Sequence, residues 1–154
     1  LSNPNSRVEA TPQDIYNWSK GKAIVATGSP FDDVEYEEKK IRISQCNNAF
    51  IFPGIGLGVI ACGAKRVTDR MITHAALALA DCSPLSHDPD GSLLPSFSRA
   101  HSVSQMVALA VAQAAAEDGV ASIQPDVDYA QRIKSIYWEP EYLPYHFKPE
   151  LMHE

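Results

Sequence analysis

The sequence has 154 residues, of which 45% are hydrophobic and 21% charged, enough for one globular domain with a buried core. A formal net charge of −6 argues against nucleic acid and against an anionic membrane surface as partners, since both are bound through excess Lys and Arg. Three cysteines without C-x-x-C spacing fit reduced thiols in a cytoplasmic protein better than disulfides or a zinc site. No signal peptide pattern is visible. Because the chain begins with Leu and not with Met, we expect it to be a piece of a longer polypeptide.

The first third of the chain predicts an α/β arrangement. A Thr-Pro pair opens a helix over residues 11–20, which ends at a glycine and carries Ile15 and Trp18, with Tyr16 as an optional third residue, on its apolar side. The apolar, β-branched run 22–27 predicts a buried strand. Residues 31–44 hold several acids without metal-ligand spacing, which indicates a surface loop or hairpin. A helix, a short loop and a buried strand are typical of α/β packing.

The stretch after this polar segment is unusually apolar. No charged residue occurs from Ala49 to Ala64, so this run must be buried. It is shorter than the roughly 20 residues of a membrane span, and it contains Pro53 and three glycines. Since Pro suits the first turn of a helix, we predict a buried core helix over residues 53–63.

The glycines of this helix are Gly54, Gly56 and Gly58. They differ from the dinucleotide fingerprint G-x-G-x-x-G because the third glycine is one position early. No acidic residue follows at the place where the fingerprint requires one. Gly54 and Gly58 are four residues apart on one helical face, so we interpret them as packing positions that admit a neighbouring backbone.

Two adjacent amides, Asn47 and Asn48, precede this helix. Free N–H groups and the helix dipole favour an anion at that position, and an Asn amide can donate to a carboxylate without adding charge. The alternative is that Asn47 merely caps or turns the chain, as Asn often does, and spacing alone favours this alternative.

The second half of the chain predicts three further helices. The first follows a Thr-Asp cap and covers residues 68–79. A loop rich in Pro, Ser, Asp and Gly spans 82–99, where His87 lies beside Asp88 but no nucleophile accompanies them. Ser102 resembles the start of a capping box for a helix that ends before Gly119.

The last predicted helix covers 126–136, and an aromatic arm follows over 137–149. This arm is too aromatic for a free tail, so we expect it to lie against its own domain or a neighbouring subunit. Its aromatic residues are Tyr137, Trp138, Tyr142, Tyr145 and Phe147.

Three stretches carry a family resemblance through their order and spacing. They are Leu1-Ser2-Asn3-Pro4, the strand that leads from Gly21 to Ala26-Thr27-Gly28-Ser29-Pro30-Phe31, and Asn47-Asn48-Ala49-Phe50-Ile51-Phe52-Pro53-Gly54. Together they resemble the C-terminal part of a malic enzyme, and the likeness extends through alanine-rich helices to about Ala121. The aromatic arm also resembles that of the bacterial NAD-dependent group.

The resemblance implies an α/β fold, the second half of a Rossmann-like NAD(P)-binding domain with three α/β/α layers, helix-rich in this segment. Residues 1–121 would form the C-terminal half of that domain, and 122–154 a C-terminal helix and arm. It further implies that the enzyme decarboxylates (S)-malate oxidatively to pyruvate and CO2, with NAD or NADP and with Mn or Mg. The implied protein is a cytoplasmic homo-oligomer, a tetramer, in which this segment needs the remainder of the malic enzyme chain.

Site residues follow from the same resemblance. Asn3 matches an Asn near the substrate and the nicotinamide ribose, and Gly28 matches a loop glycine beside the nicotinamide. Asn47 and Asn48 match the Asn pair at the malate carboxylate, and Asn48 also counts among the cofactor contacts. The family's acid/base Tyr and Lys, its acidic metal ligands and its Gly-rich fingerprint have no counterpart here. We therefore assign no catalytic and no metal-binding residue to this chain.

Two alternatives remain. A malolactic enzyme, which converts malate to lactate, shares the Asn-Asn-Ala and Pro-Gly motifs. A non-catalytic module, whose aromatic arm serves assembly only, would lack the upstream ligands altogether.

Overall fold

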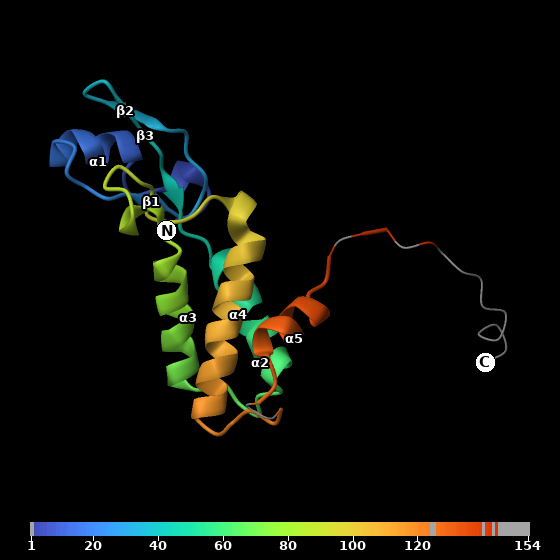
Figure 1. Cartoon of the computed structure of the whole chain (residues 1–154). Coiled ribbons are helices and arrows are strands. Elements are labelled where there is room, and N and C mark those ends of the chain that lie inside the picture. Colours follow the sequence, from blue (N-terminus) through green and yellow to red (C-terminus); the bar gives the residue numbers. More distant parts are fainter. Residues whose placement is uncertain (1, 124–125, 140, 143, 145–154) are drawn as a thin grey trace.

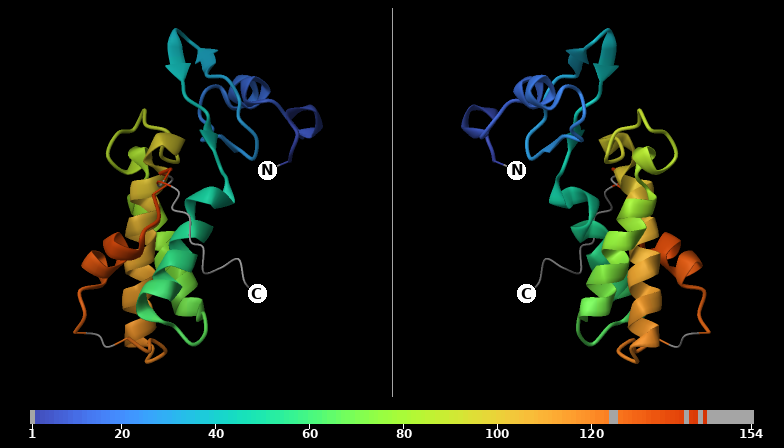
Figure 2. Two further views of the ribbon diagram at one scale, coloured as in Figure 1. Left: turned by 90° about the vertical axis from the view of Figure 1, so that its right-hand side faces the viewer. Right: turned by 90° about the vertical axis from the view of Figure 1, so that its left-hand side faces the viewer.

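The computed structural model describes residues 2–123, 126–139, 141–142 and 144, and it divides into two regions (Figure 1). Residues 2–46 form an α/β lobe, and four α-helices form a helical bundle. Figure 2 shows from two sides that the lobe lies at one end of the bundle.

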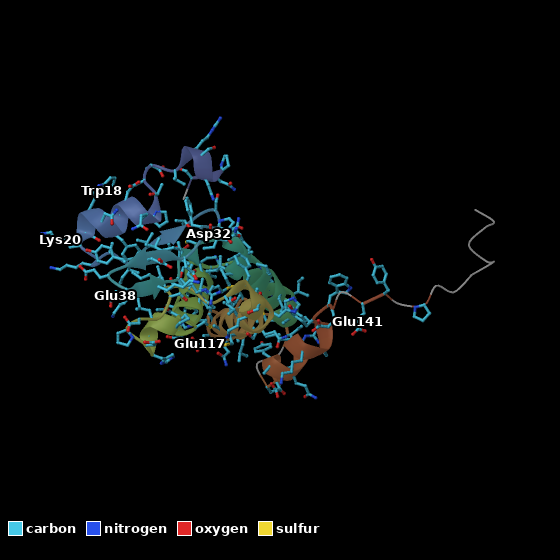
Figure 3. The ribbon with its side chains drawn as sticks, turned by 90° about the horizontal axis from the view of Figure 1, so that it is seen from above. Trp18, Lys20, Asp32, Glu38, Glu117 and Glu141 are labelled. Atoms are coloured by element: carbon cyan, nitrogen blue, oxygen red, sulfur yellow. The ribbon has the colours of Figure 1, made fainter. Side chains whose placement is uncertain are left out.

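Helix α1 of the lobe, Pro12–Ser19, begins and ends as predicted. The Thr11 hydroxyl accepts a hydrogen bond from the Asp14 amide, and Lys20 ends the helix in the left-handed conformation. The predicted apolar side was wrong in one residue, because Tyr16 is buried and Trp18 is 72% exposed. Two residues apart, these side chains lie on opposite sides of a helix, and Trp18 points away from the lobe (Figure 3).

The strands of the lobe are short and form two separate pairs. Strand β1, Ala26–Thr27, pairs in parallel with β4, Ser44–Gln45. Strands β2, Val34–Tyr36, and β3, Lys39–Ile41, form the antiparallel hairpin that the polar segment predicted. The expected strand over 22–27 was too long. Its first four residues have no ladder partner among the described residues, since β4 is only two residues long.

The bundle consists of α2, α3, α4 and α5. Helix α3 runs opposite to α4, whereas α2 runs parallel to α4 (Figure 1). Their bounds are Phe52–Cys62, Asp69–Asp81, Ala100–Glu117 and Tyr129–Ile136. Single turns of 3₁₀ helix lie at Asn5–Arg7, Asn48–Phe50, Pro84–Ser86 and Phe97–Arg99, labelled η1 to η4. Within the described ranges, none of the helices has both the length and the hydropathy that a membrane span requires.

Glycine faces bring α2 into close contact with α4. A Cβ atom on Gly54 would lie 2.6 Å from Cβ of Val107, and one on Gly58 would lie 2.6 Å from the carbonyl oxygen of Ala108. A Cβ on Gly56 would meet nothing within 4 Å. The predicted packing role is therefore confirmed for Gly54 and Gly58. All three glycines lie inside a helix, so they do not form a phosphate-binding loop.

Capping residues and glycines predicted most of the helix ends correctly. Thr68 caps α3, and glycines in the left-handed conformation follow α2 and α4, as Gly63 with φ +60° and Gly119 with φ +66°. Ser102 was wrong as a cap, because α4 begins at Ala100 as a continuation of η4. The Ser102 hydroxyl instead donates to the Arg99 carbonyl at 2.9 Å.

Helix α5 begins at Tyr129 behind an Asp128 cap, and its buried residues pack on α2 and α4. The described part of the aromatic arm then leads away from the bundle (Figure 1). The ring of Tyr137 contacts His101 edge-on, with centroids 5.6 Å apart, but Trp138 is 76% exposed and Tyr142 is fully exposed. The expected packing against the chain's own domain does not occur for these two. The remaining aromatic residues of the arm, Tyr145 and Phe147, lie outside the described residues.

Together these elements form the helix-rich α/β structure that the sequence predicted.

Candidate functional site

The parallel pair has an edge at which both strands end, and we call it the carboxyl edge. Strand β1 leads there into Gly28-Ser29-Pro30, and β4 leads into Cys46-Asn47-Asn48. The Cys46 amide donates to the Thr27 carbonyl at 2.7 Å, and Gln45 Nε2 donates to the Gly28 carbonyl at 3.2 Å. Ligands of open α/β sheets bind outside the carboxyl ends of the strands, so this edge is the first place to look for a site.

The N-terminal segment also reaches the carboxyl edge. The buried Ser29 hydroxyl donates to Oδ1 of Asn3 at 2.8 Å, and Asn5 Nδ2 donates to the Pro30 carbonyl at 2.7 Å. The Thr27 hydroxyl supports this loop from within, because it donates to the Ser29 carbonyl at 2.8 Å. The fold thus brings the predicted Asn3 next to the loop that carries the predicted Gly28.

Hydrogen bonds orient two of the predicted asparagines. Oδ1 of Asn3 accepts from Ser29, and Oδ1 of Asn47 accepts from the Ala49 amide at 2.9 Å. In both side chains the carbonyl oxygen accepts a hydrogen bond from within the chain, which leaves the NH2 group to donate to a ligand. Neither Nδ2 donates to another described residue. Amide donors in this orientation suit a carboxylate or a hydroxyl of a ligand.

Asn48 differs from Asn47. Asn47 caps η2, so the capping interpretation holds for its side-chain oxygen. Asn48 is the first residue of η2 and is exposed, and its side chain has no hydrogen-bond partner among the described residues. Capping therefore does not explain the second amide. The η2 turn, which begins at Asn48, lies between Asn47 and α2, and α2 begins at Phe52 rather than at Pro53.

Two residues that hold the carboxyl edge together were missed from the sequence. Ser29 positions Asn3, and Gln45 ties the two loops to each other through Gly28. Ser29 lies between a glycine and a proline, which signals only that a strand ends there. Its bond to a residue 26 positions earlier depends on the tertiary fold.

The described residues contain no group of three His, Cys, Asp or Glu that could hold a metal ion, so these residues by themselves form no site for the implied Mn or Mg. The His87-Asp88 pair is no catalytic dyad, because the described structure shows no hydrogen bond between them. Asp88 Oδ1 instead accepts from the Asp90 amide at 3.0 Å and closes a turn.

Known proteins resemble this chain over most of its length. A family model described as "Malic enzyme, NAD binding domain" matches residues 1–116, which include both parallel strands and all four predicted site residues. The chain is 57% identical over 142 residues to the NAD-dependent malic enzyme of Proteus mirabilis, covering 92% of this chain and 25% of that protein. It is 56% identical over 145 residues to the NAD-dependent malic enzyme of Aeromonas hydrophila, covering 94% of this chain and 26% of that protein.

Among solved structures, the chain is similar to the crystal structure of Entamoeba histolytica malic enzyme, with a TM-score of 0.62 at 26% identity. That likeness covers 82% of this chain and 23% of the solved chain. The chain thus spans about a quarter of the length of the relatives it matches.

Proposed function

Because this chain belongs to the malic enzyme family, in the part that forms the NAD-binding domain, we propose that it supplies one wall of an active site. The reaction is the oxidative decarboxylation of (S)-malate to pyruvate and CO2, with reduction of NAD. The observation that supports it most is the carboxyl edge, where the N-terminal segment with Asn3, the loop with Gly28 and the loop with Asn47 and Asn48 follow or contact one parallel pair. Relatives named as NAD-dependent malic enzymes favour NAD as the cofactor and do not favour the malolactic alternative.

We assign substrate positioning to the amides. Asn47 and Asn48 donate from their side-chain NH2 groups to a malate carboxylate, which holds the substrate without adding a charge. Asn47 is pre-oriented for this by its bond to the Ala49 amide. Holding the reacting groups in register is the contribution that such residues make to the rate.

The cofactor contacts lie on the neighbouring loop. Gly28 lets a nicotinamide approach the backbone closely, and Asn3 donates to the nicotinamide ribose from the NH2 group that Ser29 leaves outward. Asn48 contacts both cofactor and substrate. NAD, when bound, would supply the acceptor for the hydride from C2 of malate, and the proton of the substrate hydroxyl would go to a base outside this segment. Cleavage of the bond between C3 and C4 then releases CO2 and leaves an enolate, which takes up a proton at C3 to give pyruvate. We place no proton transfer and no metal ligand on this chain.

The test is Asn48→Ala in the intact enzyme. We expect kcat/KM for malate to fall about tenfold or more, since loss of a hydrogen bond to a charged group costs about 1.5–3 kcal/mol. The matched control is Asn17→Ala, which removes an exposed amide on α1. NADH formation and the identity of the product are both measured. An unchanged kcat/KM would contradict the assignment, and lactate in place of pyruvate would favour the malolactic reaction.

The domain limits and the assembly state are also proposals. We propose that residues 1–121 complete the NAD-binding domain and that 122–154 form a helix and an arm that contacts a neighbouring subunit of a homo-oligomer. The exposed Trp138 and Tyr142 support the second part. Three free cysteines support a reducing compartment, the cytoplasm.

A further inference from the structure

The loop that follows β1 has an unusual set of hydrogen bonds, and we call its residues 28–30 the clamped loop. Each of its three carbonyl oxygens accepts a hydrogen bond from a side chain. In chain order, the donors are Nε2 of Gln45 at 3.2 Å, the Thr27 hydroxyl at 2.8 Å and Nδ2 of Asn5 at 2.7 Å. These donors lie in β4, in β1 and in the N-terminal segment, so three separate parts of the chain hold one short loop.

The clamped loop is therefore ordered before any ligand arrives. Loop carbonyls on a protein surface usually bond to water, which leaves the loop free to change shape. Here the bond from Thr27 is buried, and the bond from Gln45 is partly buried, so water competes less with them. Binding to a loop that is already ordered avoids the entropic cost of ordering it, which raises affinity without any new contact.

The Ser29 hydroxyl has a different role from the three clamping side chains. It is 5% exposed, and it donates to Oδ1 of the exposed Asn3 rather than to the backbone. Asn5 already attaches the N-terminal segment to the loop. The bond from Ser29 therefore adds a constraint on the Asn3 amide itself, whose terminal torsion would otherwise have a broad range of angles. It keeps the oxygen toward the loop and the NH2 group toward a ligand.

We propose that Gln45 and Ser29 are positioning residues for the nicotinamide half of the cofactor, and that they act through different groups. Gln45 fixes the backbone of Gly28, against which the nicotinamide lies. Ser29 fixes the amide of Asn3, which donates to the ribose. This inference rests on the cofactor contacts proposed above. It requires that Ser29 acts only through Asn3 and that Gln45 acts independently of Asn3.

The first experiment measures the Kd of NADH for the intact enzyme by fluorescence titration. Ser29→Ala and Gln45→Met each remove one hydrogen-bond donor and leave the side chains that contact the cofactor in place. We expect each change to raise the Kd about three- to tenfold, as the loss of one hydrogen bond implies. Unchanged affinity in either variant would overturn the role of that residue.

Two matched controls remove the same groups outside the carboxyl edge. Ser83→Ala removes another buried hydroxyl, which donates to the Leu93 carbonyl at 2.6 Å. Gln13→Met removes an exposed amide on α1. Each control should change the Kd of NADH by less than about twofold, the usual error of such comparisons. Thermal unfolding shows whether all four variants are folded at the temperature of the titration.

Double-mutant cycles with Asn3→Ala separate the two positioning roles. Once Asn3 has lost its amide, Ser29→Ala should raise the Kd by less than about twofold further, because the group it orients is gone. Gln45→Met should keep its full effect in the same background. Additive losses for Ser29 would mean that it only supports the loop, and loss of the Gln45 effect would mean that it acts through Asn3. Either result would overturn the proposal.

Steady-state kinetics add a readout that general damage to the loop would not match. Ser29→Ala should raise the KM for NAD and change the KM for malate by less than about twofold, since Asn47 and Asn48 hold malate. Equal rises in both values would overturn the positioning role. If Asn3→Ala itself leaves the Kd of NADH unchanged, the proposed cofactor contact is wrong. If Asn3→Ala weakens binding and Ser29→Ala does not, only the present inference is wrong.

Discussion

The helical bundle and the α/β lobe differ in how much apolar surface each one buries. Among the described residues, the main core of the bundle contains thirteen buried residues, among them Met71 and Val107 with no exposed surface. The core of the lobe contains four. Since burial of apolar surface supplies most of the stabilisation, we expect the bundle to be the more stable of the two regions and the scaffold of the chain.

The proposed substrate site lies where the two regions meet. Asn48 follows the last strand of the lobe, and two residues later Phe50 is 1% exposed in the core of the bundle. Phe50 also packs on Phe97, with ring centroids 4.7 Å apart. The asparagine pair is thus held from the bundle side, while Asn3 and Gly28 come from loops of the lobe. A rigid scaffold that carries polar loops is the usual arrangement at functional sites.

The largest expected effect comes from a cavity in the bundle core. Met71→Ala should lower the free energy of unfolding by about 2–5 kcal/mol, because the removed side chain is fully buried. The sulfur of Met71 also accepts from the Thr68 amide at 3.5 Å, so the helix cap is weakened as well. Denaturant unfolding followed by helix circular dichroism measures the change.

The matched control is Met106→Ala on α4, where the side chain is 47% exposed. It should cost less than about 1 kcal/mol. Equal costs at both positions would show that the bundle core is not what stabilises the chain.

A smaller effect is expected where α2 meets α4. Gly58→Ala should destabilise by about 1–3 kcal/mol, because the new Cβ would lie 2.6 Å from the Ala108 carbonyl oxygen. Gly56→Ala on the open face of the same helix should instead stabilise by about 0.5–1 kcal/mol, through helix propensity alone. Thermal unfolding of the two variants tests the close packing directly, since opposite signs are required.

The smallest effect concerns alkaline pH. Burial raises the pKa of the Cys62 and Cys82 thiols, both in the bundle core, above the ordinary value of 9.0. A thiol whose pKa is raised in the folded state stabilises fully below pH 9.0 and loses that contribution as pH rises through the folded pKa.

We therefore expect the bundle to become less stable above this pH. Cys62→Ala should flatten that decline, as measured by unfolding at a series of pH values. A slope identical to that of the wild type would mean that this thiol does not ionise on unfolding.

Sequence reasoning placed the helices well because their signals are local. The Thr11 and Thr68 caps act within three residues, and Gly63 and Gly119 end helices through their own backbone conformation. The prediction that Ser102 begins a helix was wrong, because the preceding 3₁₀ turn η4 leads directly into α4 at Ala100. The prediction for Trp18 was also wrong, because two turns of helix do not specify which face meets the sheet.

For the candidate site, the sequence indicated Asn3, Gly28, Asn47 and Asn48 through a family resemblance. The spacing of Asn47 and Asn48 by itself could not distinguish capping from binding. The structure shows that Asn47 caps a turn through its Oδ1, while its NH2 group has no hydrogen-bond partner among the described residues.

The sequence alone determined the helices, the packing face of Gly54 and Gly58, and the family, because these depend on residues close together in the chain. It left residues 31–44 open between a surface loop and a hairpin. Only the tertiary structure decided that Ser29 orients Asn3 across 26 positions. It alone decided that Lys39 meets Asp90 across 51 positions, and that side chains from separate segments bond the backbone of one loop. The physical reason is that such contacts form when distant segments pack together, and local patterns do not encode which segments meet.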